Sequence, residues 1–182
     1  MKDEQEGALP TGWALVPLKS VVVKVSTTGK KLKRKDFADE GAYPVIDQGQ
    51  AFVAGYSNRS DCVIEIDNPV IVFGDHSRTV KLVKKHFIPG ADGVKVLQPF
   101  GGVLAEYLEY ALRFRTIDLV DKGYARHYQH LEKSQIPIPP LNEQRRIVAK
   151  IEELFSELDN GVESLKTARA QLQTYRQSLL KA

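Results

Sequence analysis

The stretch IPIPPLNEQRRIVAKIEELFSELD, residues 136–159, separates two parts of the chain that differ in character. Short apolar runs and turn residues precede it, whereas the residues after Pro139-Pro140 are charged and follow a seven-residue repeat almost to the end of the chain. Proline is excluded from a helix interior because it lacks an amide hydrogen. We therefore expect a helix to begin after Pro140, with Asn142 as its N-cap. A helix of about 40 residues would be about 60 Å long at 1.5 Å per residue.

Apolar and small side chains repeat every seven residues along this final segment, in two interleaved sets. The first set is Ile147, Leu154, Gly161, Ala168 and Tyr175, and the second is Ile151, Leu158, Leu165, Leu172 and Leu179. Members of the combined series lie four and three residues apart in turn, which is the a/d pattern of a coiled coil, sustained for about five heptads. The pattern predicts that the helix pairs with a second helix. A helix that folds back on its own domain is the alternative.

The charges of this segment change sign near its middle. The acidic half, 152–163, contains no base, and the basic half, 164–182, contains no acid. A parallel pair of such helices would place like charges side by side, whereas an antiparallel pair places acids beside bases. Gly161 and Ala168 would let two backbones approach closely. The sequence therefore predicts an antiparallel homodimer through residues 145–180.

The composition of the chain is that of a folded protein of one domain with an appendage. The 182 residues are 42% hydrophobic and 27% charged, and no apolar run approaches the roughly 20 residues of a membrane helix. The N-terminal residues are polar, unlike a secretory signal, and the single cysteine, Cys62, excludes a disulfide or a cysteine zinc cluster within one chain. We expect a cytoplasmic protein. A net charge of +3 permits nucleic-acid binding without requiring it.

Three regions are predicted along the chain. Residues 1–10 are expected to be disordered, residues 11–138 to form a globular domain of α/β (α+β) class, and residues 139–182 to form the long helix. Strands are predicted in 43–57, 62–83 and 86–100, a helix in 103–114 and a polar loop in 122–134, whereas 12–25 fits either a strand or a short buried helix. The run VIVF, 70–73, is apolar on both faces and predicts a central strand. Residues 62–66 alternate and predict a separate strand before it.

No catalytic motif is recognisable. A phosphate-binding loop is lacking, and Gly101-Gly102 fits a turn before a helix rather than a dinucleotide fingerprint. The segment IPIPP lacks the polar and aromatic ends of an amino-methyltransferase motif. Acidic residues near Asp75 and His76 lack the following lysine of a metal-dependent nuclease. We expect no catalytic residues and no metal site. A small self-sufficient nuclease and a coiled-coil adaptor without a DNA role are the alternatives to a DNA-binding protein.

Polar side chains suited to DNA gather in loops. Arginine can bind guanine, glutamine can bind adenine, and histidine and serine reach phosphates and base edges. A lysine-rich loop suits the phosphate backbone. The candidate DNA-binding residues are Lys30, Lys31, Lys33, Arg34, Lys35, Gln48, His76, Ser77, Arg78, Arg126, His127, Gln129 and His130.

Three segments together resemble the specificity (S) subunit of type I restriction–modification systems. They are the pattern PxGWxxxPL near the start, the run YPVIDQGQ, and QIPIPPLNEQRRIVAKIEELFSELD followed by the heptad helix. The resemblance runs from about Leu9 to Leu180 and implies an α/β target-recognition domain before a long helix. In that family two such units stand in tandem with antiparallel helices, and each domain reads half of an interrupted DNA sequence.

The resemblance also implies partners. The helices hold two modification (M) subunits, which bind S-adenosylmethionine and methylate adenine, and restriction (R) subunits join that core. The chain itself is then expected to need no cofactor, with double-stranded DNA, a second copy of itself and the M and R subunits as partners, and no membrane. Residues 142–180 correspond to the surface for the dimer and the M subunits.

This sequence departs from the family pattern because it holds one recognition domain and one helix. Two copies joined by antiparallel helices would restore the missing half by symmetry. The DNA site should then be an interrupted palindrome with half-sites about one helical turn, about 34 Å, apart.

Overall fold

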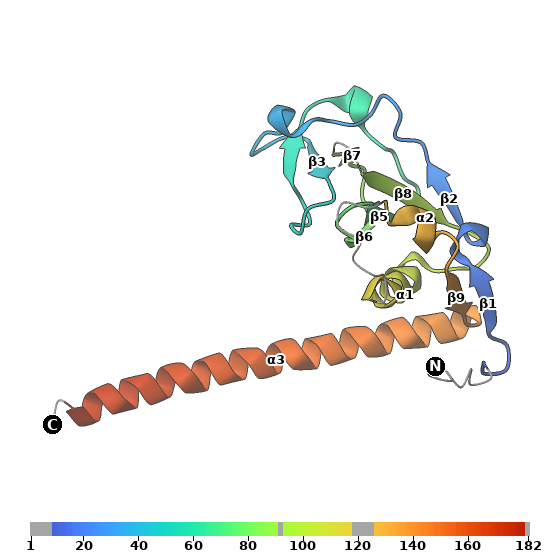
Figure 1. Ribbon diagram of the computed structural model, residues 1–182. Coiled ribbons are helices and arrows are strands. Elements are labelled where there is room, and N and C mark those ends of the chain that lie inside the picture. Colours follow the sequence, from blue (N-terminus) through green and yellow to red (C-terminus); the bar gives the residue numbers. More distant parts are fainter. Residues whose placement is uncertain (1–8, 91–92, 118–125, 181–182) are drawn as a thin grey trace. The chain divides into compact units, whose positions relative to one another are not determined.

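The computed structural model describes residues 9–90, 93–117 and 126–180 (Figure 1). The predicted disordered segment, 1–10, lies outside these ranges except for its last two residues. The chain divides into two compact units, Met1–Gln144 and Arg145–Ala182, and each is described by itself.

A four-stranded antiparallel sheet forms the centre of the first unit. Its strands run in the order β2 (Val22–Val25), β8 (Val94–Pro99), β5 (Val70–Gly74) and β6 (Val80–Val83). All five residues of β5 are buried, because the strand lies between two neighbours and is covered on both faces. The prediction of a central strand from VIVF is confirmed.

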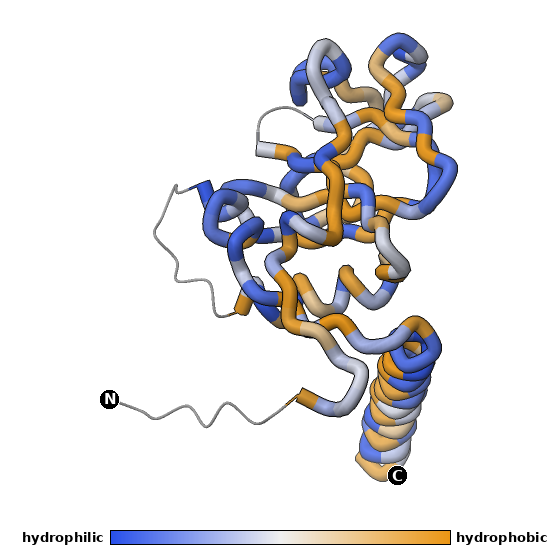
Figure 2. The backbone as a smooth tube through the Cα atoms, turned by 90° about the vertical axis from the view of Figure 1, so that its right-hand side faces the viewer, coloured by the Kyte–Doolittle hydropathy of each residue, from blue (hydrophilic) through white to orange (hydrophobic). Residues whose placement is uncertain are grey.

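The two faces of this sheet contribute to different hydrophobic clusters, since successive side chains of a strand point to opposite sides. On one face Ile71, Phe73 and Leu97 pack with Leu108 and Leu112 of helix α1 (Ala105–Ile117). The other face packs against a second sheet, in the order β4 (Gly55–Ser57), β3 (Tyr43–Ile46) and β7 (Ile88–Pro89). Figure 2 shows hydrophobic residues concentrated in the interior of the domain.

A two-stranded ribbon joins the beginning and the end of the domain. Strand β1 (Ala14–Pro17) pairs antiparallel with β9 (Gln135–Ile138), so that Ala14 lies opposite Ile138. The first four residues of QIPIPP thus belong to the folded domain and pair with β1. The carbonyl of Pro137 also accepts a 2.6 Å hydrogen bond from the hydroxyl of Tyr107.

Two predicted strand segments fold differently. The run 12–25 contains two strands, β1 and β2, separated by a 3₁₀ turn at Leu18–Ser20. Residues 62–66 form no strand: a 3₁₀ turn covers Ser60–Cys62, and Ile64 makes an isolated bridge to Phe87. Three consecutive side chains of this segment are buried in two different clusters, which breaks the alternation that the prediction assumed.

The predicted polar loop 122–134 contains a short helix, α2 (Tyr128–Leu131). Its first and last residues are three apart and are both buried in the α1-side cluster, so tertiary packing stabilises one helical turn in a polar stretch. Residues 118–125 lie outside the described residues.

The long helix α3 (Leu141–Leu180) has 40 residues, in agreement with the heptad prediction. It begins one residue before the predicted N-cap. The carbonyl of Pro140 accepts the amides of Glu143 and Gln144 at 2.8 and 3.0 Å, so Asn142 lies inside the first turn.

The first turn of α3 belongs to the first unit and is held there by Gln144, which is 1% exposed. Its Oε1 accepts the amide of Leu104 at 2.8 Å. Its Nε2 donates to the carbonyls of Gly102 at 3.1 Å and Pro139 at 2.9 Å. One residue earlier, Glu143 accepts a 3.1 Å hydrogen bond from the indole of Trp13. The buried amide therefore satisfies three backbone groups at once.

Replacing Gln144 with Ala should lower the free energy of unfolding by about 1–3 kcal/mol, because buried backbone groups lose their partners. Denaturant unfolding followed by circular dichroism measures this loss. Gln173→Ala, at an exposed position on the outer face of the same helix, is the matched control and should stay within about 0.5 kcal/mol of the unaltered chain. Equal effects from the two substitutions would contradict the assignment.

Candidate nucleic-acid interface

Three segments that are distant in the sequence meet at one end of the central sheet. They are the 47–52 loop after β3, the 74–79 turn between β5 and β6, and the 126–130 segment that leads into α2. Gln48 joins the first two, because its Oε1 accepts the amide of His76 at 3.3 Å and its carbonyl accepts the hydroxyl of Thr79 at 3.0 Å. The structure thus brings together candidate residues from all three segments.

Asp75 ties the 74–79 turn to the 126–130 segment. It is 4% exposed, and its Oδ1 accepts the amide of Tyr128 at 2.7 Å. Its carbonyl accepts the amide of His127 at 3.0 Å, and its own amide donates to Gly93 at 2.6 Å. Lys95 lies 3.7 Å from the other carboxylate oxygen. Asp75 therefore positions the neighbouring segments rather than pointing to solvent.

The 74–79 turn is tightly constrained. The hydroxyls of Ser77 and Thr79 lie 2.9 Å apart, and the amide of Arg78 donates to the carbonyl of Gly74 at 2.9 Å. A Cβ atom at Gly74 would collide with the hydroxyl of Ser77, so only glycine fits there. The candidate residue Ser77 uses its hydroxyl to hold the turn, while His76 and Arg78 are partly exposed.

The candidates of the 126–130 segment differ in exposure. Arg126, Gln129 and His130 are exposed and accessible to a large partner. His127 is 3% exposed, and its Nε2 has no hydrogen-bond partner. In this conformation His127 packs inside the domain, where it supports its neighbours.

The basic loop around residues 30–35 is held by the second sheet. The amide of Leu32 donates to Pro89 at 3.0 Å, and the ammonium of Lys30 donates to the carbonyl of Val63 at 2.6 Å. Lys31, Lys33, Arg34 and Lys35 are exposed. In Figure 1 this loop lies beside β3, at the end of the domain away from β1 and β9. Its cations therefore form a patch of their own.

Lys81, which the sequence analysis did not single out, supports the 47–52 loop by hydrogen bonds to its backbone. It is 4% exposed, and its ammonium donates to the carbonyls of Asp47 at 2.8 Å and Ala51 at 2.6 Å. The carboxylate of Asp47 lies 3.7 Å away. Burial lowers the pKa of Lys81 from its ordinary value, against the opposing effect of Asp47. The signal in the sequence is a lone lysine inside the apolar strand VKLV.

Burial also affects Tyr128 at the start of α2. It raises the pKa of Tyr128 to about 12, with the nearby carboxylates of Glu132 and Asp75 adding to the rise. The hydroxyl therefore stays neutral throughout the physiological range.

The absence of a metal site near Asp75 and His76 stays a prediction. Asp75 is engaged with α2, and within residues 9–90, 93–117 and 126–180 no three histidine, cysteine or carboxylate side chains are grouped to bind an ion. In the same described part of the chain, no helix combines the length and the apolarity that crossing a membrane requires.

The second unit presents a different kind of surface. The heptad side chains from Leu154 onward are exposed along the helix, Leu154 by 50% and Leu165 by 72%. Gly161 and Ala168 are exposed as well, and Ile147 and Ile151 are partly exposed. Phe155 and Val162 extend this apolar strip to one side of the heptad positions. A continuous apolar strip of this kind is typical of an interface.

The family comparison covers both units. Residues 10–169 match the protein family described as the type I restriction modification DNA specificity domain. The specificity subunit of the type I restriction enzyme EcoR124I/EcoR124II of Escherichia coli is 26% identical over 179 residues, which cover 91% of this chain and 44% of that protein. The chain thus spans less than half the length of this relative.

Solved structures share the fold. The HsdS subunit from Thermoanaerobacter tengcongensis aligns with a TM-score of 0.61 and 21% identity, over 86% of this chain and 41% of that one. The type I S subunit from M. genitalium aligns with a TM-score of 0.61 and 20% identity, over 88% of this chain and 42% of that one. A third structure comes from a study of complex assembly and conformational transition of the type I R-M system. It aligns with a TM-score of 0.64 and 22% identity, over 97% of this chain and 45% of that one. The predicted α+β domain followed by a long helix is confirmed.

Asp75→Ala should lower the free energy of unfolding by about 1–3 kcal/mol, because the buried amide of Tyr128 loses its acceptor. Denaturant unfolding at neutral pH measures the change. Asp61→Ala is the matched control: Asp61 also pairs with a neighbour, Arg59, but its side chain is 63% exposed, and the free energy of unfolding should hardly change. Similar losses in both variants would argue against a positioning role for Asp75.

Proposed function

The chain belongs to the family of type I restriction–modification DNA specificity domains, and on that premise we propose that it is a DNA-reading subunit without catalytic activity of its own. The observation that carries this proposal is the match over residues 10–169, which includes the globular domain and most of the long helix. The convergence of exposed Arg126, Gln129 and His130 with partly exposed His76 and Arg78 supports a DNA-facing surface.

The proposed working form is a homodimer. The chain covers 44% of the length of its E. coli relative, so two copies together approach the size of one full-length subunit. The open heptad strip and the change of charge along the helix support an antiparallel pair. Two identical recognition domains related by a two-fold axis read an interrupted palindrome.

The proposed partners supply the chemistry. The M subunits bind S-adenosylmethionine and methylate adenine at the site that this chain selects, and R subunits add the restriction activity. The chain binds no cofactor itself and acts in the cytoplasm. The alternative of a self-sufficient nuclease would require cleavage by the purified chain alone.

The heptad positions define a register for the antiparallel pair. With the two-fold axis beside Glu163, the two heptad sets face each other, so that Leu165 lies opposite Gly161 of the partner copy and Leu158 lies opposite Ala168 of the partner copy. Large side chains then meet small ones around the middle. In this register Phe155 flanks Arg169 of the partner copy, which allows a cation–π contact.

A disulfide experiment tests this register. Chains carrying Glu157→Cys mixed with chains carrying Gln171→Cys should cross-link on oxidation, because these positions flank the strip and face each other across the axis. Each variant alone should not cross-link, since its two copies would be two heptads, about 21 Å, apart. The native Cys62 is 2% exposed and does not interfere. Cross-linking of either single variant instead would contradict this register.

Methylation mapping tests the function. Expression with the cognate M subunit, followed by sequencing that detects methylated adenine, should give one interrupted palindromic motif. Leu165→Asp on the heptad strip should abolish this methylation, whereas Gln173→Asp on the outer face of the helix should preserve it. A non-palindromic bipartite motif would contradict the homodimer, and the absence of any motif would contradict the reading function.

A further inference from the structure

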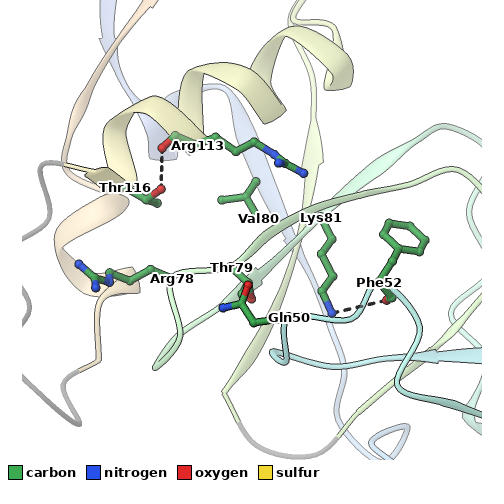
Figure 3. Close-up of a pocket in the computed structure, with 8 residues that line it drawn as sticks. All are labelled: Gln50, Phe52, Arg78, Thr79, Val80, Lys81, Arg113 and Thr116. Atoms are coloured by element: carbon green, nitrogen blue, oxygen red, sulfur yellow. Dashed lines mark hydrogen bonds between the residues drawn. The ribbon is translucent and has the colours of Figure 1, made fainter. Parts of the chain in front are cut away.

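A polar pocket lies where the 47–52 loop, strand β6 and the end of α1 meet (Figure 3). Its volume is about 310 Å³. Its lining includes the long polar side chains Gln50, Arg78 and Arg113, which come from three different elements. Gln50 and Arg113 are not among the residues that the sequence singled out.

The loop that carries Gln50 is rigidly supported. It wraps around the buried ammonium of Lys81, which donates to the carbonyls of Asp47 and Ala51 on either side of Gln50. The amide of Gly49 donates to the carboxylate of Asp47 at 2.8 Å. Gln50 itself is exposed and lines the pocket.

The backbone of Arg78 is equally fixed. Arg78 has a φ of 59°, a left-handed conformation that residues with side chains rarely adopt and that folded proteins retain mainly at functional positions. Hydrogen bonds from its amide to Gly74 and between Thr79 and the carbonyl of Gln48 hold the turn against the 47–52 loop. Gln50 and Arg78 are therefore presented by two loops that are bonded to each other.

The third long side chain, Arg113, is tied to its own helix. The guanidinium of Arg113 is paired at 2.8 Å with Glu109 on the same helix, so part of its charge and hydrogen-bonding capacity is used. Arg113 is placed to form the wall of the pocket and to favour a polyanion in its vicinity.

We propose that Gln50 and Arg78 are the base-reading residues of the domain: Arg78 binds the O6 and N7 atoms of a guanine, and Gln50 binds the N6 and N7 atoms of an adenine, in the major groove. These pairings follow from the geometry of the two side chains, and direct readout requires them to be held on a rigid backbone. This assignment rests on the proposed function and goes beyond it by naming the residues and the bases. Gln48, whose amide oxygen and carbonyl are both engaged, positions the loops instead.

The test is selection from a randomised DNA duplex library by the complex of the full chain with its M subunit. Arg78→Ala should remove the preference for guanine at one position of each half-site and weaken binding to the wild-type sequence about 10- to 100-fold. Gln50→Ala should do the same for adenine at one other position. Arg78→Lys keeps the charge but loses the two-pronged donor, so it should relax the same position as Arg78→Ala.

Arg59→Ala is the matched control, because it removes an exposed arginine that pairs with Asp61 and should leave the selected sequence unchanged. Uniformly weaker binding with an unchanged sequence preference would overturn base reading by either residue in favour of phosphate contact. If the variants kept both the DNA affinity and the sequence preference of the wild type, the pocket would not be part of the DNA interface. A wild-type complex that enriches no sequence would overturn the proposed function itself and this assignment with it.

Discussion

The complete burial of strand β5 is the constraint on which the domain depends. Its side chains supply both hydrophobic faces of the central sheet, so α1 and the second sheet pack on opposite sides of one strand. The same strand ends at Gly74, where the constrained turn begins. The turn is therefore held in place by the core. Asp75 in this turn accepts the backbone amides of His127 and Tyr128, which fixes the start of α2.

Local patterns in the sequence were sufficient for the elements whose form is set by periodicity. The heptad repeat gave the long helix and the apolar run VIVF gave the central strand, because each depends on neighbours within one element. Two predictions were wrong. The side chains of 62–66 are buried in two clusters and do not alternate, and the single turn of α2 is stabilised by residues distant in the sequence. Asp75 and Lys81 were missed as supports for the same reason: their partners lie about thirty to fifty residues away in sequence. For the same reason, residue spacing could not predict that the 47–52, 74–79 and 126–130 segments lie together.

The segments that carried the family resemblance have a structural explanation. The PxGWxxxPL pattern contributes Trp13, and the LNEQ run contributes Glu143, and these two side chains share a hydrogen bond. The next residue, Gln144, satisfies backbone groups of the loop before α1 and of the proline pair. Two stretches far apart in the sequence, near the start and the end of the first unit, are thus linked by hydrogen bonds that require these residue types.

The β1–β9 ribbon has a further consequence for how such a domain can change. Because Ala14 pairs with Ile138, the chain enters and leaves the domain through adjacent strands. The whole segment between β1 and β9 is therefore one insertion between two paired strands. A segment whose two ends lie together can be replaced as a unit without stretching the flanking chain. Under the proposed function, exchange of the whole segment between β1 and β9 would give a new binding specificity while leaving the ribbon and the helical segment that follows it intact.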